Sequence, residues 1–104
     1  MAVSSALAQD NLFPIKDKGK FGYINKSGKV VIAPAYDFAE SFSEGLAAVE
    51  IARKRGFIDN TGKMVIAPAY ERTTNFSEGL ASGKKEGKWS FFDKTGKTIF
   101  DVKC

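Results

Sequence analysis

Short apolar runs alternate with polar or turn-forming residues along the whole chain. Stretches such as Phe21-Gly22-Tyr23-Ile24 and Val30-Val31-Ile32 are rich in aromatic or β-branched residues, as is typical of strands. Gly or Pro interrupts the pattern about every ten residues, and no apolar set recurs at the helical spacing. The pattern therefore predicts an all-β chain with almost no helix.

The pattern repeats with a period of 34 residues. The segment 28–36 returns almost unchanged as 62–70, and residues 22–55 match residues 56–89 at seventeen of thirty-four positions without a gap. Such self-similarity indicates a repeat protein. We expect a flexible N-terminal tail over residues 1–11 and a single β domain over residues 12–104. This domain consists of a partial repeat 12–21, repeat 22–55, repeat 56–89 and a partial repeat 90–104.

Each repeat is predicted to be an antiparallel meander of three strands. Its first hairpin is closed by Asn25-Lys26-Ser27-Gly28-Lys29, which predicts a type I turn followed by a left-handed Gly that forms a bulge. The side chain of Asn or Asp at the first position is expected to bond the turn backbone. Because Gly28, Gly62 and Gly96 hold the left-handed position, a side chain at Gly62 is expected to cost more than one at Gly22.

Further along the repeat, Pro34 and Pro68 are expected to end the second strand, because proline removes a hydrogen-bond donor. In the next segment, Glu44 or Glu78 is predicted to cap at most one helical turn, which the following Gly ends. Neighbouring meanders must then cover each other's apolar faces. The sequence leaves open whether they form an open stack or a closed barrel or propeller-like arrangement.

These residues resemble the WG repeat, also called the KWG type, of many bacterial proteins. The segment Phe-Ser-Glu-Gly-Leu-Ala of that family is intact twice, at 42–47 and 76–81, and the likeness covers about residues 12–100. The name-giving dipeptide reads Phe21-Gly22, Arg55-Gly56 and Trp89-Ser90. The resemblance implies a β-rich repeat module with a binding or scaffolding role.

The register of Phe21, Arg55 and Trp89 is the candidate ligand-binding site. An Arg between aromatic faces would form a cation–π ladder that can also stack on a sugar, a base or a peptide. The alternative is that the three side chains pack between adjacent units.

Candidate catalytic groups are few. The chain has no His and one Cys, Cys104, and its glycines form no phosphate-binding motif. Glu44 and Glu78 recur once per repeat and are weighed as an acid–base pair, with the capping role as the alternative. We expect no enzyme, no cofactor and no metal site.

The net charge of +4 comes from scattered lysines. Lys20, Lys54 and Lys88 recur in register, but nucleic-acid binding is not expected from this spread of charge. No apolar run reaches the roughly 18 residues of a membrane span. A cytoplasmic chain is expected, and Ala6-Leu7-Ala8, which resembles the end of an export signal, keeps export as the alternative.

The function expected from these features is a non-enzymatic binding or scaffold module that contacts a protein partner through a repetitive β surface. The alternative is a carbohydrate or cell-wall binding module that uses Phe21, Arg55 and Trp89. Exposed edge strands predict a homodimer formed by strand addition or face-to-face packing, with Phe100 and Val102 in the apolar terminal strand. Closure of the terminal strands into a small barrel is the other option.

Overall fold

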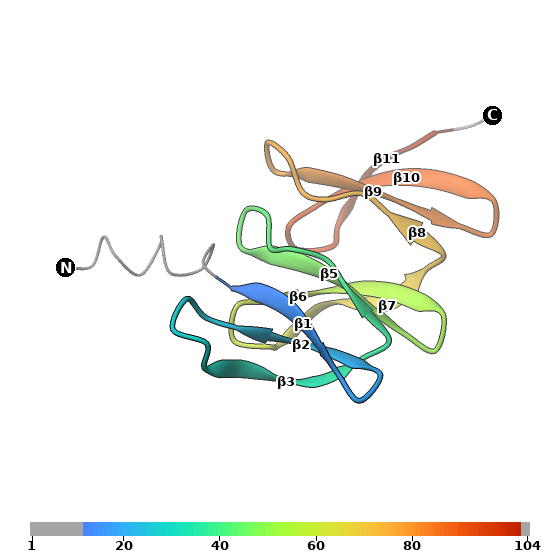
Figure 1. Ribbon diagram of the computed structural model, residues 1–104. Helices are drawn as coiled ribbons and strands as arrows, with labels where there is room; N and C mark the ends of the chain where they lie inside the picture. The colour runs from blue at the N-terminus through green and yellow to red at the C-terminus, as the bar shows by residue number, and fades with distance from the viewer. Residues whose placement is uncertain (1–11, 103–104) are drawn as a thin grey trace.

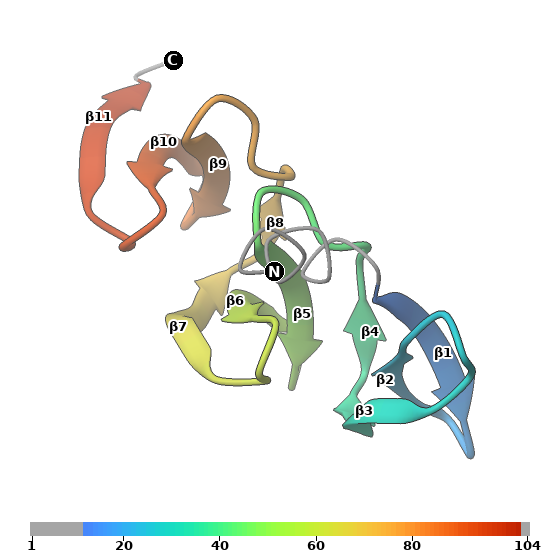
Figure 2. The same cartoon turned by 90° about the vertical axis from the view of Figure 1, so that its left-hand side faces the viewer.

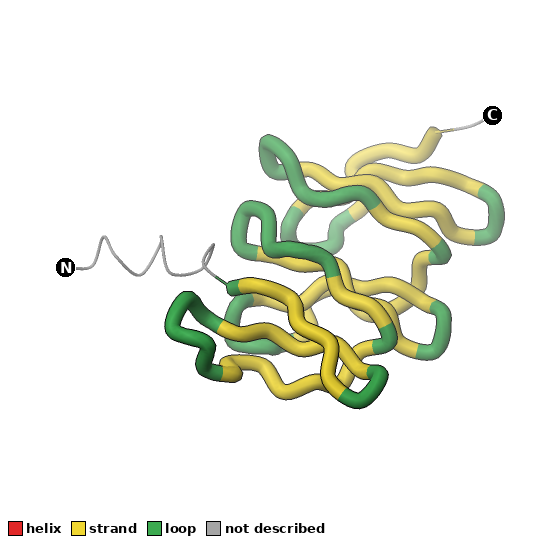
Figure 3. Tube along the Cα trace, in the orientation of Figure 1, coloured by secondary structure: helices red, strands yellow, loops and turns green. Residues whose placement is uncertain are grey.

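The computed structural model describes residues 12–102, which form three antiparallel β-sheets, here called the first, middle and last sheet (Figure 1). These residues contain strands, loops and turns but no helix (Figure 3). The prediction of an all-β array of antiparallel meanders is confirmed. The strands are β1 (Phe13–Asp17), β2 (Lys20–Ile24) and β3 (Val30–Tyr36) in the first sheet, β4 (Phe38–Ala39), β5 (Leu46–Ile51), β6 (Lys54–Asp59) and β7 (Met64–Tyr70) in the middle sheet, and β8 (Arg72–Thr73), β9 (Leu80–Lys85), β10 (Lys88–Asp93) and β11 (Thr98–Val102) in the last sheet.

The predicted tail over residues 1–11 and Cys104 lie outside the described residues. Strand β1 lies at the edge of the first sheet, where the missing hydrogen-bond donor of Pro14 is tolerated. Within residues 12–102 no helix has the length and apolarity that a helical membrane crossing requires.

The three sheets lie one after another in an open stack (Figure 2). Strands that follow one another along the chain pair in each sheet, and the two-residue strands β4 and β8 add a short fourth strand to the middle and last sheets. The stack measures 45 × 35 × 16 Å. Of the two arrangements that the sequence left open, the structure has the open one.

Two apolar cores fill the two junctions between sheets. We call the face of a sheet that is turned toward the next sheet along the chain its forward face, and the opposite side its backward face. The middle sheet is covered on both faces, because Ile58 lies in the first core and Phe57 in the second. The first core contains Leu12, Tyr23, Ile32, Tyr36, Ala39, Ala47, Val49 and Ile58, and the second contains Leu46, Ala48, Phe57, Ile66, Phe76, Ala81 and Phe92.

The sheets and the sequence repeats have different boundaries. The chain leaves the first sheet at Tyr36 and enters the middle sheet at Phe38. Repeat 22–55 therefore supplies β3 to the first sheet and β4 and β5 to the middle sheet, where β5 pairs with β6 of the following repeat. Because adjacent repeats share a sheet, backbone pairing as well as side-chain packing joins them.

The hairpin turn has the predicted geometry. The Asp59 carboxylate accepts the N–H groups of Thr61 and Lys63 at 2.9 and 3.0 Å, and Gly62 has a φ of 91°. Asn25 and Asp93 accept the corresponding bonds in the other two sheets. The local sequence thus determines this turn without help from the rest of the fold.

The expectation that proline ends the second strand is wrong. Pro34 lies inside β3 and Pro68 inside β7. In both strands the pairing register shifts at this point, so that the prolines lie at a bulge. A bulged residue is left out of the hydrogen-bonding ladder, and the donor that proline lacks is therefore not needed there.

The same bulge reverses the expected importance of Gly22. A Cβ at Gly22 would lie 2.5 Å from the carbonyl oxygen of Ile32, and one at Gly56 would lie 2.3 Å from that of Ile66. Such contacts with backbone atoms cannot be relieved by turning a side chain, so glycine is required by close approach rather than by its φ. In the last sheet the equivalent residue is Ser90. A side chain is tolerated at this position because β10 and β11 pair there without a shift.

Candidate interaction surface

Aromatic pairs hold each junction together. Phe42 packs edge-on against Tyr23 at a ring-centroid distance of 4.9 Å, and Phe76 packs in the same way against Phe57 at 4.9 Å. Tyr23 and Phe57 lie on the forward faces of the first and middle sheets, and Phe42 and Phe76 come from the loop between the first two strands of the sheet that follows. In the first pair, the buried Tyr23 hydroxyl donates a hydrogen bond to the carbonyl oxygen of Glu40, which holds the Tyr23 ring in place. Burial also raises the pKa of Tyr23.

The segment after each of these phenylalanines is a tight turn and not the predicted helical turn. Ser43 and Leu46 exchange two backbone hydrogen bonds, and Glu44 and Gly45 between them have φ values of 55° and 84°. Two consecutive left-handed residues define a two-residue hairpin of type I′. Glu44 therefore does not cap a helix.

The side chains of this turn connect the middle sheet to the last one. The Ser43 hydroxyl donates to the carbonyl oxygen of Phe76 at 2.7 Å. The Glu44 carboxylate accepts the N–H groups of Glu78 and Gly79 at 2.6 and 2.9 Å, in the equivalent turn of the next repeat. The Lys94 ammonium lies 3.7 Å from the same carboxylate. We call this set of contacts the turn-to-turn clamp.

The clamp sets the protonation of Glu44. The N–H group of Gly79, with that of Glu78 and the nearby charge of Lys94, holds the pKa of the Glu44 carboxyl below its ordinary value against the opposing effect of desolvation. The contact uses the backbone of Glu78, so Glu44 acts here as a structural link between two sheets. Nowhere in residues 12–102 do three His, Cys, Asp or Glu side chains gather in a way that would hold a metal ion.

Among residues 12–102, no sheet packs against the forward face of the last sheet. Phe91, the equivalent of the fully buried Phe57, is only half-buried and stacks on Phe100 at a ring-centroid distance of 4.8 Å. Phe100 itself is 50 % exposed, whereas its equivalent Ile66 is 6 % exposed. The last sheet therefore exposes the kind of apolar face that the middle sheet buries.

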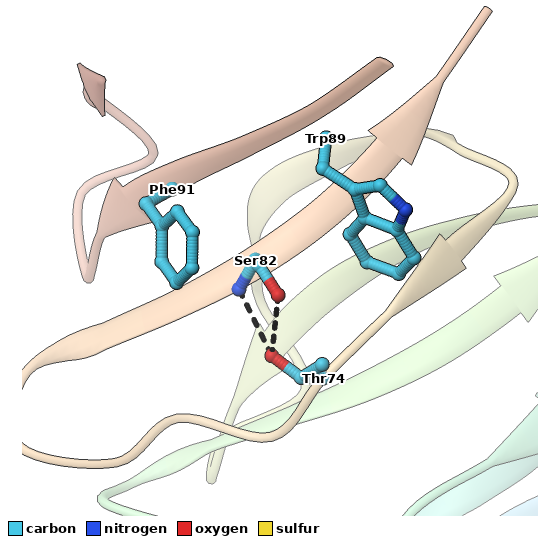
Figure 4. A pocket seen from close by; sticks show the side chains of 4 residues that line it. All are labelled: Thr74, Ser82, Trp89 and Phe91. Carbon is cyan, nitrogen blue, oxygen red and sulfur yellow. Dashed lines mark hydrogen bonds between the residues drawn. The ribbon is translucent and has the colours of Figure 1, made fainter. Parts of the chain in front are cut away.

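A groove of about 330 Å³ lies on this face, lined by Thr74, Ser82, Trp89 and Phe91 (Figure 4). Trp89 and Phe91 project from β10. Ser82 lies on the neighbouring strand β9, beside Phe91, and Thr74 contacts Ser82. The Thr74 hydroxyl accepts the N–H group of Ser82 at 2.9 Å and bonds its hydroxyl at 3.0 Å. Because these two hydroxyls satisfy each other, the groove presents an almost wholly apolar lining.

The predicted register of Phe21, Arg55 and Trp89 occupies equivalent positions on β2, β6 and β10. Phe38 lies between the first two: its ring centroid is 5.6 Å from that of Phe21 and 5.1 Å from the Arg55 guanidinium. Arg55 also pairs with Glu50 at 3.4 Å. Of the three residues, only Trp89 lines the groove.

Sequence reasoning missed the other groove residues, Thr74, Ser82 and Phe91. Alternation along β10 was the available signal, because Trp89 and Phe91 are two residues apart and share one face of the sheet. The three lysines that recur in register are exposed, and Lys20 bonds Asp37. They do not line the groove.

Comparison with known proteins gives one match. The model of the family described as WG containing repeat matches residues 21–54 and 56–89, which make up more than half of the chain. No curated protein and no solved structure gave a match. The two matched segments carry the Gly-Pro bulge and the Phe-Ser-Glu-Gly turn described above, and on this basis the chain belongs to the WG containing repeat family.

Proposed function

We propose that the chain is a non-enzymatic binding or scaffold module that contacts a protein partner through the forward face of its last sheet. The observation that carries this proposal is the groove beside Trp89 and Phe91 on an uncovered apolar sheet face. Large exposed apolar surfaces of folded proteins are usually interaction sites. Aromatic side chains, tryptophan above all, contribute most to such contacts.

The internal junctions indicate what the groove accepts. In the second core, Phe76 packs against Phe57, which is the equivalent of the groove residue Phe91. The groove therefore corresponds to the place that a phenylalanine occupies at the covered junction. We infer that a partner inserts an aromatic or large aliphatic side chain there.

Peptide selection on the chain of residues 1–104 tests this proposal. Peptides displayed on phage are selected on the wild type, and their dissociation constants for the wild type and for Trp89→Ala are then measured. We expect enriched peptides with an aromatic residue and dissociation constants of about 1–100 μM, at least about tenfold weaker for the variant. Circular dichroism shows whether the variant keeps its β-sheet structure.

The proposal would be contradicted if no enriched peptide bound the wild type at about 100 μM protein, the weak end of the expected dissociation constants. It would also be contradicted if the peptides bound the wild type and Trp89→Ala equally well. Ile51→Glu is the matched control, because Ile51 is an exposed apolar residue that does not line the groove. Its binding is expected to equal that of the wild type.

Carbohydrate binding is the second candidate, and the exposed part of Trp89 favours it because sugars stack on indole rings. The apolar lining argues for a protein partner instead, since a sugar needs polar groups to satisfy its hydroxyls. Trp89 is the only tryptophan of the chain, so its fluorescence reports on the groove directly. A saturable change during titration with chito- or cello-oligosaccharides would favour the carbohydrate alternative.

A further inference from the structure

The first sheet also has an apolar face against which no other sheet of residues 12–102 packs. Phe13 and Val30 are 47 % and 49 % exposed. Ile15 and Ile24 are half-buried. The middle-sheet residues in register with these four pack in the first core or against it. They are Ala47 for Phe13, Val49 for Ile15, Ile58 for Ile24 and Met64 for Val30.

The two ends of the stack thus present the two halves of one kind of junction. A forward face packs against a backward face at both junctions inside the chain. We propose that a second copy of the chain seats the backward face of its first sheet on the forward face of the last sheet, so that copies associate head to tail. This inference rests on the proposed function, because it uses the same forward face.

Charge supports the same alignment. Inside the chain, Glu44 of the middle sheet lies close to Lys94 of the last sheet. In a head-to-tail pair the corresponding residues are Glu78 of one copy and Lys26 of the second, which stands in register with Lys94. Both are exposed and have opposite charge, so that this contact repeats the ion pair of the internal junction.

The hairpin glycines support it as well. A Cβ at Gly62 would lie 3.6 Å from Ile32, and one at Gly96 would lie 3.2 Å from Ile66. Each hairpin therefore packs on the preceding sheet. The remaining hairpin glycine, Gly28, has no atom within 4 Å of that position. Its partner in the head-to-tail register is Phe100, the exposed residue that follows Ile32 and Ile66 in the series.

The contact between copies is expected to be weaker than the junctions inside the chain. The connecting backbone that holds the internal sheets together is absent between copies. Association is therefore expected at tens to hundreds of micromolar rather than at nanomolar concentrations, about 5–6 kcal/mol of binding free energy.

Head-to-tail contacts differ from a symmetric dimer in one testable respect. Each copy uses two different surfaces, so that association continues beyond the dimer or closes into a ring. A copy that is blocked at one end can still bind through the other. Two copies that are blocked at opposite ends must therefore form a pair and stop there.

Sedimentation of the chain of residues 1–104 under reducing conditions tests this inference. Phe13→Glu blocks the backward face of the first sheet, and Phe100→Glu blocks the forward face of the last sheet. Because both side chains are about half exposed in the fold, both variants are expected to remain folded, and circular dichroism checks this. Ile51→Glu is the control, because Ile51 is an exposed apolar residue of the middle sheet.

We expect the average mass of the wild type and of Ile51→Glu to rise with concentration beyond that of a dimer or up to that of a ring. Each blocked variant alone should show at least tenfold weaker association. An equimolar mixture of the two should form a one-to-one pair. A wild type that stays monomeric up to about 1 mM, where binding is worth only about 4 kcal/mol, would overturn the inference.

Association of Phe13→Glu alone into a dimer would also overturn it, because forward faces would then pair with each other. The same holds for a mixture of the two variants that stays monomeric. Failure here can be told from failure of the proposed function, because peptides selected on the wild type can be measured on Phe13→Glu, whose forward face is unchanged. Peptide binding without self-association would leave the proposed function standing.

Discussion

The middle and last sheets have nearly the same design but opposite surroundings. Phe57 in the middle sheet is fully buried under the last sheet, while its equivalent Phe91 lies at an open groove. Ile66 is covered by the hairpin at Gly96, while its equivalent Phe100 is half exposed. The comparison teaches that the repeat encodes an apolar forward face whether or not a sheet follows. An array of such units leaves an apolar sheet face uncovered wherever the stack stops.

The largest expected difference is between the two equivalent phenylalanines. Phe57→Ala removes a fully buried ring that contacts Phe76 and Phe92, and it should lower the free energy of unfolding by about 3–5 kcal/mol. Phe91→Ala removes a half-buried ring and should cost about 1–2 kcal/mol. Urea unfolding at low micromolar concentration measures both. Equal losses would show that the last sheet is covered in solution.

The bulge gives the next largest contrast. Gly56→Ala places a Cβ against the carbonyl oxygen of Ile66 and should cost about 3 kcal/mol, because backbone atoms must move. Ser90→Ala changes the equivalent position of the last sheet, where pairing is regular, and should stay within about 0.5 kcal/mol. Thermal or urea unfolding checks the pair. A mild effect at Gly56 would contradict the close approach seen at the bulge.

The clamp predicts a smaller effect that depends on pH. Because the pKa of Glu44 is lowered in the folded protein, the clamp stabilises fully above the unfolded-state pKa, whose ordinary value is 4.5, and this stabilisation is lost as the pH falls through the folded-state value. The midpoint temperature of thermal unfolding of the wild type should therefore fall as the pH is lowered from 5 to 3. Glu44→Gln should have a lower midpoint temperature than the wild type at pH 6, and its midpoint should fall less as the pH is lowered.

Part of the acid sensitivity should remain in Glu44→Gln. Hydrogen bonds from Lys20 and Thr95, respectively, also lower the pKa values of Asp37 and Asp93. Glu78→Gln is the matched control in the last sheet, because no hydrogen bond to the Glu78 carboxylate occurs among residues 12–102. A profile of Glu78→Gln that resembles that of Glu44→Gln would contradict the clamp as the cause.

The smallest predicted change concerns the turn between β5 and β6. Ala52 and Arg53 have φ values of 53° and 70°, whereas Gly87 takes the second of these positions between β9 and β10. Arg53→Gly removes left-handed strain from the middle sheet and should stabilise by about 0.5–1 kcal/mol. Gly87→Ala should destabilise by about 1 kcal/mol. Melting temperatures measure both, and a destabilising Arg53→Gly would contradict the assigned strain.

The sequence predicts the parts of the fold that depend on neighbouring residues. The turns at Asn25, Asp59 and Asp93 followed from residue type alone, because each side chain bonds its own turn. The helical turn at Glu44 was wrong because its partner, the backbone of Gly79, is 35 residues away. A local pattern cannot distinguish a carboxylate that caps its own turn from one that bonds the next turn.

Contacts between strands explain the other differences. The expectation that Pro34 ends a strand was wrong because the strand continues through a bulge opposite Gly22. This bulge depends on the pairing of β2 with β3, which a local pattern does not contain. In the candidate site, the repeat register predicts Trp89. Thr74 and Ser82 lie beside Trp89 only because β9 pairs with β10, and this pairing brings together residues that are apart in the sequence. The groove also depends on which sheet face is left uncovered, a property of the stack rather than of any repeat.

Amide hydrogen exchange of the wild type at low micromolar concentration tests most directly the claim that the middle sheet is covered on both faces and the last sheet on one. We predict the slowest exchange in β5 and β6, whose residues from Ala47 to Val49 and Phe57 and Ile58 are at most 1 % exposed. Strand β11, with the exposed Ile99 and Phe100, should exchange at least tenfold faster. Protection of β10 and β11 equal to that of β5 and β6 would contradict the account.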